Sequence, residues 1–234
     1  MVVSASTTIR EDTKLLNYNG RCFLTGCDEK TEWMLEWFLK NYRKHNDTPI
    51  LVADFGMSNE MLARLQVNPI VSEIVKLPPV KSGGWFYKPT ALLSCPYFEK
   101  CWLDTDIEVL GDLSGVFDYI EDEKLAMVED RPWSARRGEK WHNSGVIALR
   151  GNPDILQRWA NECRRASKTG DQEVLHSMIN ESPLTRLKYI VDLPNIYNWL
   201  RIQIIDGQDS NKKLAMHWTG QHGKNVIWKK IYNG

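Results

Sequence analysis

Two aspartates separated by a single residue form a candidate metal site. Asp104 and Asp106 lie in the segment Trp102-Leu103-Asp104-Thr105-Asp106-Ile107. On an extended backbone, side chains two residues apart project to the same side, so both carboxylates offer hard oxygen ligands to one divalent cation. The apolar residues on either side predict a buried segment, and buried carboxylates require a cation or hydrogen-bond donors. The alternative interpretation is a pair of solvated loop aspartates, because so short a pattern is common.

A histidine close to the carboxyl end is the candidate third ligand. His217 follows the apolar stretch Leu214-Ala215-Met216. Mn²⁺ accepts mixed oxygen and nitrogen ligands, so a site that includes this imidazole favours Mn²⁺, with Mg²⁺ as the alternative. Residues 220–224 are expected to form a flexible loop that contacts an anion, with Lys224 as the partner of a phosphate. A lone histidine is also compatible with an ordinary core or surface position.

The elements that must position these residues predict an α/β domain. Short apolar runs typical of strands alternate with stretches in which apolar residues recur at helical spacing. The expected strands are 21–25, 49–53, 71–77, 101–103, 125–128, 144–149 and 214–218, and the expected helices are 33–45, 59–65, 88–93, 153–166 and 172–180. The acidic pair then follows a strand, and open α/β sheets bind ligands at the carboxyl ends of their strands.

Length and composition restrict the class of protein. The 234 residues suffice for one large α/β domain, and we expect a single domain over 1–234. Lys plus Arg and Asp plus Glu both number 30, so no overall field attracts nucleic acid, and an anionic ligand must be held locally. No apolar run is long enough to predict a membrane span. Five cysteines without a CxxC pair favour reduced thiols and a cytoplasmic location.

Four segments, taken in order, resemble glycosyltransferases of the GT-A fold and look most like glycosyltransferase family 8, the group of glycogenin and bacterial galactosyltransferases. The segments are Asp104-Thr105-Asp106-Ile107-Glu108-Val109-Leu110-Gly111-Asp112-Leu113, Asn143-Ser144-Gly145-Val146, Gly170-Asp171-Gln172 and His217-Trp218-Thr219-Gly220. The resemblance extends over about residues 21–224. It implies a GT-A type α/β fold, with a Rossmann-like, mostly parallel central sheet flanked by helices. In such a fold about 20–110 would bind the nucleotide and about 111–234 the sugar and the acceptor.

The resemblance also implies roles for individual residues. The implied metal ligands are Asp104, Asp106 and His217. The implied contacts to the donor are Cys27, Asp28, Asp54, Lys88, Asp104, Thr105, Asn143, Gly220 and Lys224. The implied groups around the reacting sugar are Asp171, Gln172, Asp130 and Glu129. Several have structural alternatives, such as a helix N-cap for Asp171 and a strand-to-turn position for Asp54.

One position departs from the family pattern. Lys224 comes one residue later than expected, and Asn225 replaces the proline that usually follows, so His222 or Lys229 is an alternative contact to the diphosphate.

The implied activity is transfer of a hexose from a nucleotide sugar to a hydroxyl group, with Mn²⁺ or Mg²⁺ as cofactor. The resemblance favours a UDP-hexose donor, a glycan or glycoprotein acceptor, and retention of the anomeric configuration. An inverting enzyme is the alternative, with Glu129, Asp130 or Asp171 as the base.

Two functions outside this class also compete. A nucleotidyltransferase is weakly supported, because Thr25-Gly26-Cys27-Asp28 lacks a glycine-rich basic phosphate loop. A non-catalytic carbohydrate-binding domain would need only the tryptophans. The chain could also be part of a longer multidomain protein.

Overall fold

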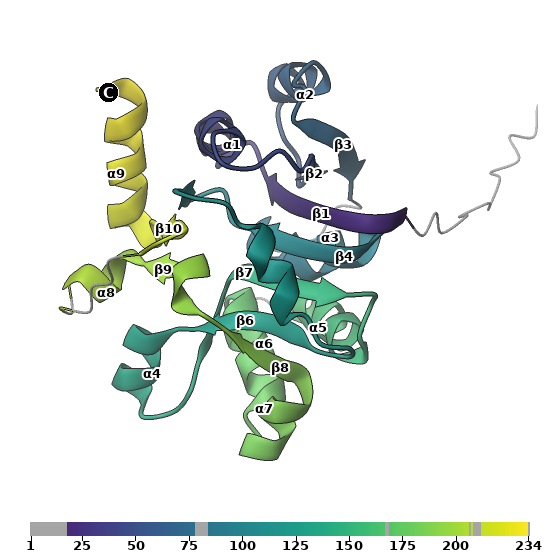
Figure 1. The fold of residues 1–234 in the computed structure, drawn as a ribbon, viewed down its shortest axis with the longest axis vertical. Coiled ribbons are helices and arrows are strands. Elements are labelled where there is room, and N and C mark those ends of the chain that lie inside the picture. The colour runs from purple at the N-terminus through teal and green to yellow at the C-terminus, as the bar shows by residue number, and fades with distance from the viewer. Residues whose placement is uncertain (1–17, 78–83, 167–168, 206, 208–211, 234) are drawn as a thin grey trace, which may run out of the picture.

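The central sheet contains seven strands in the part of the chain that the structure, a computed structural model, describes: residues 18–77, 84–166, 169–205, 207 and 212–233. Their order is β3-β2-β1-β4-β7-β6-β8, and β7 alone runs antiparallel to its neighbours (Figure 1). The strands are β1 (Tyr18–Cys27), β2 (Ile50–Asp54), β3 (Val71–Lys76), β4 (Tyr97–Leu103), β6 (Leu125–Glu129), β7 (His142–Arg150) and β8 (Ile190–Leu193). The predicted α/β fold with a mostly parallel sheet is confirmed.

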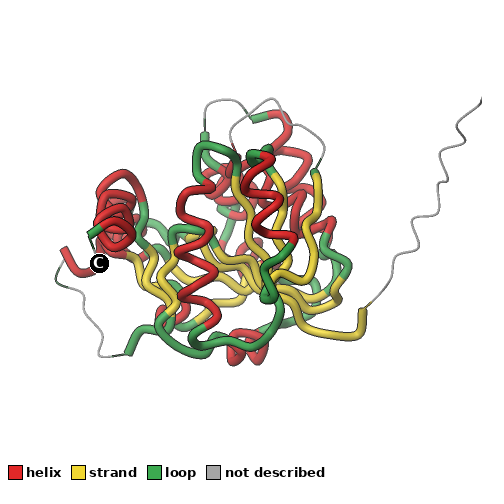
Figure 2. The backbone as a smooth tube through the Cα atoms, turned by 90° about the horizontal axis from the view of Figure 1, so that it is seen from above, coloured by secondary structure: helices red, strands yellow, loops and turns green. Residues whose placement is uncertain are grey.

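Helices lie on both sides of this sheet (Figure 2). Alternate strand residues point to opposite faces, so Phe23 and Cys101 join the core under α1 and α2, while Leu24 and Trp102 join the core under α3, α5 and α6. The helices are α1 (Leu35–Arg43), α2 (Asn59–Gln66), α3 (Lys88–Ser94), α4 (Arg131–Arg137), α5 (Asp154–Arg165), α6 (Asp171–Ile179), α7 (Pro183–Tyr189), α8 (Arg201–Ile205) and α9 (Gly220–Tyr232). Short 3₁₀ turns lie at Glu32–Met34, Gly84–Tyr87, Ser114–Tyr119 and Asn195–Tyr197.

A second, three-stranded sheet lies beside the end of β4. It consists of β5 (Ile107–Val109), β10 (Ala215–His217) and β9 (Trp199–Leu200), in the order β5-β10-β9. The predicted strand at 214–218 is therefore β10, but it belongs to this small sheet and not to the central one. Its antiparallel pairing with β5 aligns His217 with Ile107, and its parallel pairing with β9 aligns His217 with Leu200.

The expected flexible loop at 220–224 is wrong, because these residues form the first turns of α9. The glycines suggested flexibility, but Gly223 is buried in the helix and serves close packing instead. A Cβ atom there would lie 1.9 Å from the carbonyl oxygen of Trp218. Farther along α9, the ring of Trp228 packs edge-on against Trp33, with centroids 5.6 Å apart, which fixes the helix beside α1.

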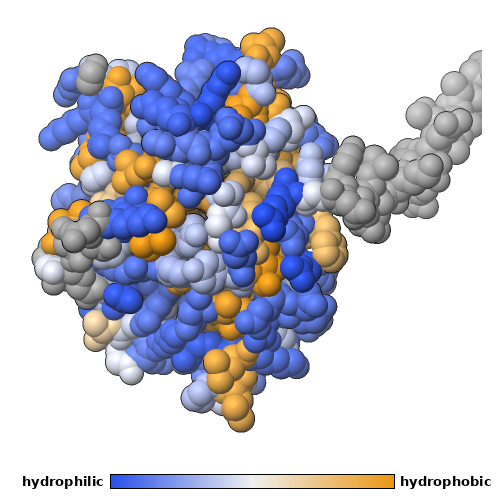
Figure 3. Space-filling view, in the orientation of Figure 1, coloured by the Kyte–Doolittle hydropathy of each residue, from blue (hydrophilic) through white to orange (hydrophobic). Residues whose placement is uncertain are grey.

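The face of the molecule in Figure 3 is largely hydrophilic. An apolar patch at its lower end lies over α7, whose exposed apolar side chains are Leu184 and Leu187. None of the helices in the described residues is both long and apolar enough to cross a membrane.

Candidate functional site

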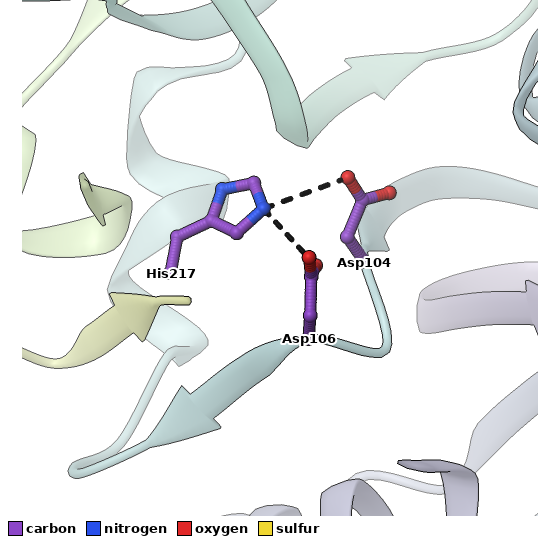
Figure 4. Close-up of side chains that lie close together, drawn as sticks. All are labelled: Asp104, Asp106 and His217. Carbon is purple, nitrogen blue, oxygen red and sulfur yellow. Dashed lines mark ion pairs between the residues drawn. The ribbon is translucent and has the colours of Figure 1, made fainter. Parts of the chain in front are cut away.

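Asp104, Asp106 and His217 converge where the two sheets meet. Asp104 follows the last residue of β4, and its amide donates to the carbonyl of Gly145 at 2.9 Å. His217 Nε2 lies 3.0 Å from a carboxylate oxygen of Asp106 and 3.8 Å from one of Asp104 (Figure 4). The β5–β10 pairing causes this approach, because it sets His217 beside the residue that follows Asp106.

These three side chains fit a divalent cation. One ligand atom from each lies within 4.8 Å of the others, and they are the only such group among the described residues. Two ligands on opposite sides of a metal, each at about 2.1 Å, are about 4.2 Å apart. The separations of 3.0 and 3.8 Å from Nε2 are therefore compatible with one ion between the three groups. Two carboxylate oxygens and one imidazole nitrogen are ligands that divalent cations accept.

Asn198 orients the His217 ring through its second nitrogen, Nδ1. Its Nδ1 lies 2.9 Å from Oδ1 of Asn198, and Asn198 Nδ2 donates to Oδ1 of Asn143 at 2.9 Å. Because Asn198 is fully buried and its amide group is engaged at both ends, it holds Nε2 toward the aspartates. Gly145 leaves room for the ring, since a Cβ atom there would lie 2.2 Å from His217 Cε1.

The three candidate ligands shift one another's pKa values. Burial lowers the pKa of His217, but Asp106 outweighs burial, so the pKa lies above its ordinary value. Burial raises the pKa of Asp106, yet His217 carries it below the usual range. Burial raises the pKa of Asp104, and Lys88 offsets this only in part. The two carboxylates therefore favour the protonated form of His217, and a metal ion bound at Nε2 would compete with that proton.

Lys88 is a buried cation on the other side of Asp104. Its Nζ lies 3.0 Å from Asp104 Oδ1 and 3.1 Å from Asp171 Oδ2, and donates to the carbonyl of Ser144 at 2.8 Å. Burial lowers the pKa of Lys88, but the carboxylates of Asp104 and Asp171 outweigh burial and raise it. The charge of Lys88 is therefore engaged by protein groups, which ties α3 and α6 to the end of β4.

An amide network joins the carboxyl end of β6 and the amino end of β7 to α6. Asn143 Nδ2 donates to Gln172 Oε1 at 3.1 Å and lies 3.3 Å from Asp130 Oδ2, which also accepts from Gln172 Nε2 at 3.2 Å. The other oxygen of Asp130 accepts from the amide of Trp133 at the start of α4. Because Asn143 also contacts Asn198, this network continues to His217.

A cavity of about 800 Å³ opens over the acidic pair. Most of the residues that the sequence assigned to the donor or the sugar line it: Cys27, Asp28, Lys88, Asp104, Thr105, Asp106, Asp130, Asn143, Asp171, Gln172, Gly220 and Lys224. His217 is buried beside the carboxylates.

Asp54 and Glu129 are not among the lining residues. Asp54 is buried, and its carboxylate accepts from the amides of Gly56 and Met57, both at 2.8 Å, so it stabilises the turn after β2. The neighbouring Phe55 lines the cavity instead. Glu129 pairs with His142 inside the sheet, and the cavity begins at the next residue, Asp130.

Sequence reasoning missed several residues at this site. Asn198 has no recognisable motif around it. Arg201, Trp133 and Glu173 line the cavity from α8, α4 and α6. The sequence contains 10 tryptophans, but composition does not indicate which of them reaches a site.

Comparison with known proteins identifies the fold. No known family model matches this sequence, and no curated protein matches it. The structure of the glycosyltransferase GlyE from Streptococcus pneumoniae matches with a TM-score of 0.62 and 17% identity, over 90% of this chain and 60% of GlyE. Its apo form matches with a TM-score of 0.66 and 18% identity over the same shares. The chain thus spans about 60% of the length of GlyE.

A second protein matches over most of both chains. The galactosyltransferase LgtC, in complex with donor and acceptor sugar analogs, has a TM-score of 0.55 and 12% identity, over 85% of this chain and 87% of LgtC. This protein therefore has the fold of the glycosyltransferases GlyE and LgtC.

Proposed function

We propose that this protein is a metal-dependent glycosyltransferase of the GT-A type that moves a hexose from a nucleotide sugar, a UDP-hexose, to a hydroxyl group of a glycan or glycoprotein. The observation that carries the proposal is the convergence of Asp104, Asp106 and His217 at a cavity of about 800 Å³ in a fold shared with GlyE and LgtC. A domain that only binds carbohydrate does not require the acidic pair, because aromatic and amide groups are sufficient for such binding.

The leaving diphosphate requires positive charge. Mn²⁺ held by Asp104, Asp106 and His217 would supply a Lewis acid that stabilises the developing negative charge. Lys224 adds a second cation, because it lines the cavity and lies near enough to Asp106 to lower the pKa of that carboxyl group. It extends from α9, whose amino-terminal end also carries partial positive charge.

The sugar would lie against the amide network. Asn143, Gln172 and Asp130 hold one another through hydrogen bonds of 3.1 to 3.3 Å, so their polar groups are oriented before a ligand arrives. Preorganised groups lose little entropy on binding and orient the reacting carbon. We assign the nucleotide to about 20–110, through Cys27 and Asp28 at the end of β1, and the sugar and acceptor to about 111–234.

We favour retention of the anomeric configuration. An inverting enzyme needs a carboxylate that is available as a base. Asp171 is paired with Lys88, Asp130 accepts three hydrogen bonds, and Glu129 does not line the cavity. Glu173 is a lining acid without such a partner among the described residues. NMR assignment of the product linkage decides the question, and an inverted product that is lost in Glu173→Gln would contradict retention.

A turnover assay tests the proposal as a whole. We expect the protein to release free nucleotide from UDP-glucose or UDP-galactose in Mn²⁺ and not in chelator. Asp106→Ala should abolish this release, whereas Asp122→Ala, at a surface ion pair with Arg150, should not. A thermal-shift series with the same donors gives a second measurement, since a ligand that binds the native state raises its stability. Absence of both turnover and metal-dependent nucleotide binding would refute the proposal and favour a carbohydrate-binding module.

A further inference from the structure

The four basic side chains that line the cavity differ in whether a carboxylate pairs with them. They are Lys30, Lys88, Arg201 and Lys224. Lys88 is paired with Asp104 and Asp171. Within the described part of the chain, Lys30, Arg201 and Lys224 form no ion pair with a carboxylate. A basic group that faces a cavity without a carboxylate partner is available to an anionic ligand.

Arg201 differs from the two lysines because the fold fixes its position. The parallel pairing of β9 with β10 aligns Leu200 with His217, and both strands end there. Arg201 and Thr219 therefore follow the ends of two neighbouring parallel strands. Arg201 Nε donates to the carbonyl of Thr219 at 2.6 Å. Its Nη2 lies 3.8 Å from the position that a Cβ atom on Gly220 would take.

The hydrogen bond to Thr219 uses only Nε of Arg201, so the two terminal nitrogens of the guanidinium can bind a ligand. Nη1 and Nη2 of Arg201 have no hydrogen-bond partner among the residues described. These groups present a planar fork that matches two oxygens of a phosphate, which an ammonium group cannot reproduce. Because Nε is already held, little side-chain entropy is lost when the fork binds.

The surroundings of the guanidinium also favour an anion. α9 begins beside it with no side-chain cap and no acidic residue in its first turn, so its first amides keep their partial positive charge. Gly220 and Lys224 of this helix line the same cavity, as do both candidate metal-binding aspartates. A bound cation, Lys224 and Arg201 would then surround one region of the cavity.

We propose that Arg201 binds the donor's diphosphate through Nη1 and Nη2, beside the metal. This inference rests on the proposed function and adds to it a residue that no sequence motif indicates. It divides the basic residues by role: Lys88 neutralises the acidic cluster, whereas Arg201 and Lys224 contact the ligand. The contact should be stronger for free UDP than for a UDP-sugar, because the terminal phosphate of UDP carries an additional negative charge.

Binding of UDP in Mn²⁺, measured by calorimetry, tests the contact. We expect Arg201→Gln to weaken UDP binding by about tenfold or more, as for loss of a hydrogen bond between charged groups. Arg201→Lys should recover part of the loss, since it keeps the charge without the fork. Arg165→Gln, at an exposed arginine of α5, is the matched control and should change nothing.

Three further measurements separate ligand contact from a structural role. Binding of Mn²⁺ without nucleotide, the thermal midpoint, and binding of uridine by ligand-observed NMR should all be unchanged in Arg201→Gln. Equal UDP affinity in Arg201→Gln and wild type would overturn the contact alone. Joint loss of Mn²⁺ affinity and thermal stability would also overturn it, in favour of a role in holding α9. A wild-type protein that binds no UDP in Mn²⁺ would overturn the proposed donor and this contact together.

Discussion

Gly145→Ala should disrupt the candidate metal site without replacing any of the three candidate ligand residues. A methyl group at this position would lie 2.2 Å from His217 Cε1, 2.5 Å from Nδ1 and 2.9 Å from Asn143 Oδ1. Ordinary van der Waals contact begins at 3.4 Å, so the ring must retreat by about 1.2 Å, the difference between 3.4 and 2.2 Å. Metal–ligand distances tolerate only about 0.2 Å.

The expected consequence is a large loss of Mn²⁺ affinity. Disturbing the support of a ligating histidine typically costs about 10- to 100-fold in affinity, and displacement of the ligand itself should lie at the upper end. Overpacking should also lower the free energy of unfolding of the metal-free protein by about 1–3 kcal/mol. Calorimetric titration with Mn²⁺ and urea unfolding in chelator measure the two effects.

Two controls connect these effects to the contact with His217. Gly20→Ala places its methyl group no closer than 3.8 Å to other atoms, so it should leave Mn²⁺ binding unchanged. In a His217→Ala background the clash with the ring is absent, so Gly145→Ala should cost much less stability than in the wild type. Wild-type Mn²⁺ affinity in Gly145→Ala, or an equal stability cost in both backgrounds, would refute the reasoning.

Three further predictions follow from the same site. Asn198→Ala should lower Mn²⁺ affinity by about 10- to 100-fold, because Asn198 holds Nδ1 of His217 at 2.9 Å; unchanged affinity by calorimetry would contradict this role. Lys88→Ala should lower the free energy of unfolding by about 3–5 kcal/mol, since it leaves Asp104 and Asp171 without their buried cation. Lys230→Ala, at a more exposed pair, should cost less than about 1 kcal/mol. Comparable urea midpoints of the two variants would contradict the role of Lys88 as a buried counter-charge. The raised pKa of His217 stabilises the metal-free protein fully below pH about 6.5, and this contribution disappears as the pH rises through the folded-state pKa. Because Mn²⁺ binds neutral imidazole, its affinity should increase with pH across that window. Below the folded-state pKa of His217 its binding should release a proton, detected as a dependence of the calorimetric enthalpy on the buffer, and His217→Ala should abolish the release.

Local patterns were enough to place the acidic pair. Apolar residues before Asp104 predict a buried strand, and β4 ends at Leu103, one residue ahead of it. The helix that Lys88-Pro89 opens was predicted for a similar reason, since proline suits a first helical turn and α3 begins there. These features depend on interactions within a few residues, so periodicity and end signals reveal them.

Such local patterns do not indicate which of two adjacent residues faces a cavity. Asp54 was expected to contact the donor, yet its carboxylate caps a turn and Phe55 lines the cavity. Which of two adjacent side chains faces the cavity depends on sheet register, here the alignment of Cys27 with Asp54. Gly223 was expected to confer flexibility, but it allows α9 to approach the backbone of Trp218, a contact that local propensity does not contain.

The sequence by itself determined the α/β class, the strand that leads into Asp104 and Asp106, and the three residue types that could bind a divalent cation. Only the tertiary structure decided that His217 reaches those carboxylates, that Asn198 orients it, and that Arg201 emerges beside α9. The physical reason is that these contacts arise from the pairing of β10 with β9 and with β5, and β5 is far from both in the chain. Such pairing is selected by packing of the whole domain, because closing a long loop costs entropy that only many cooperative contacts can offset.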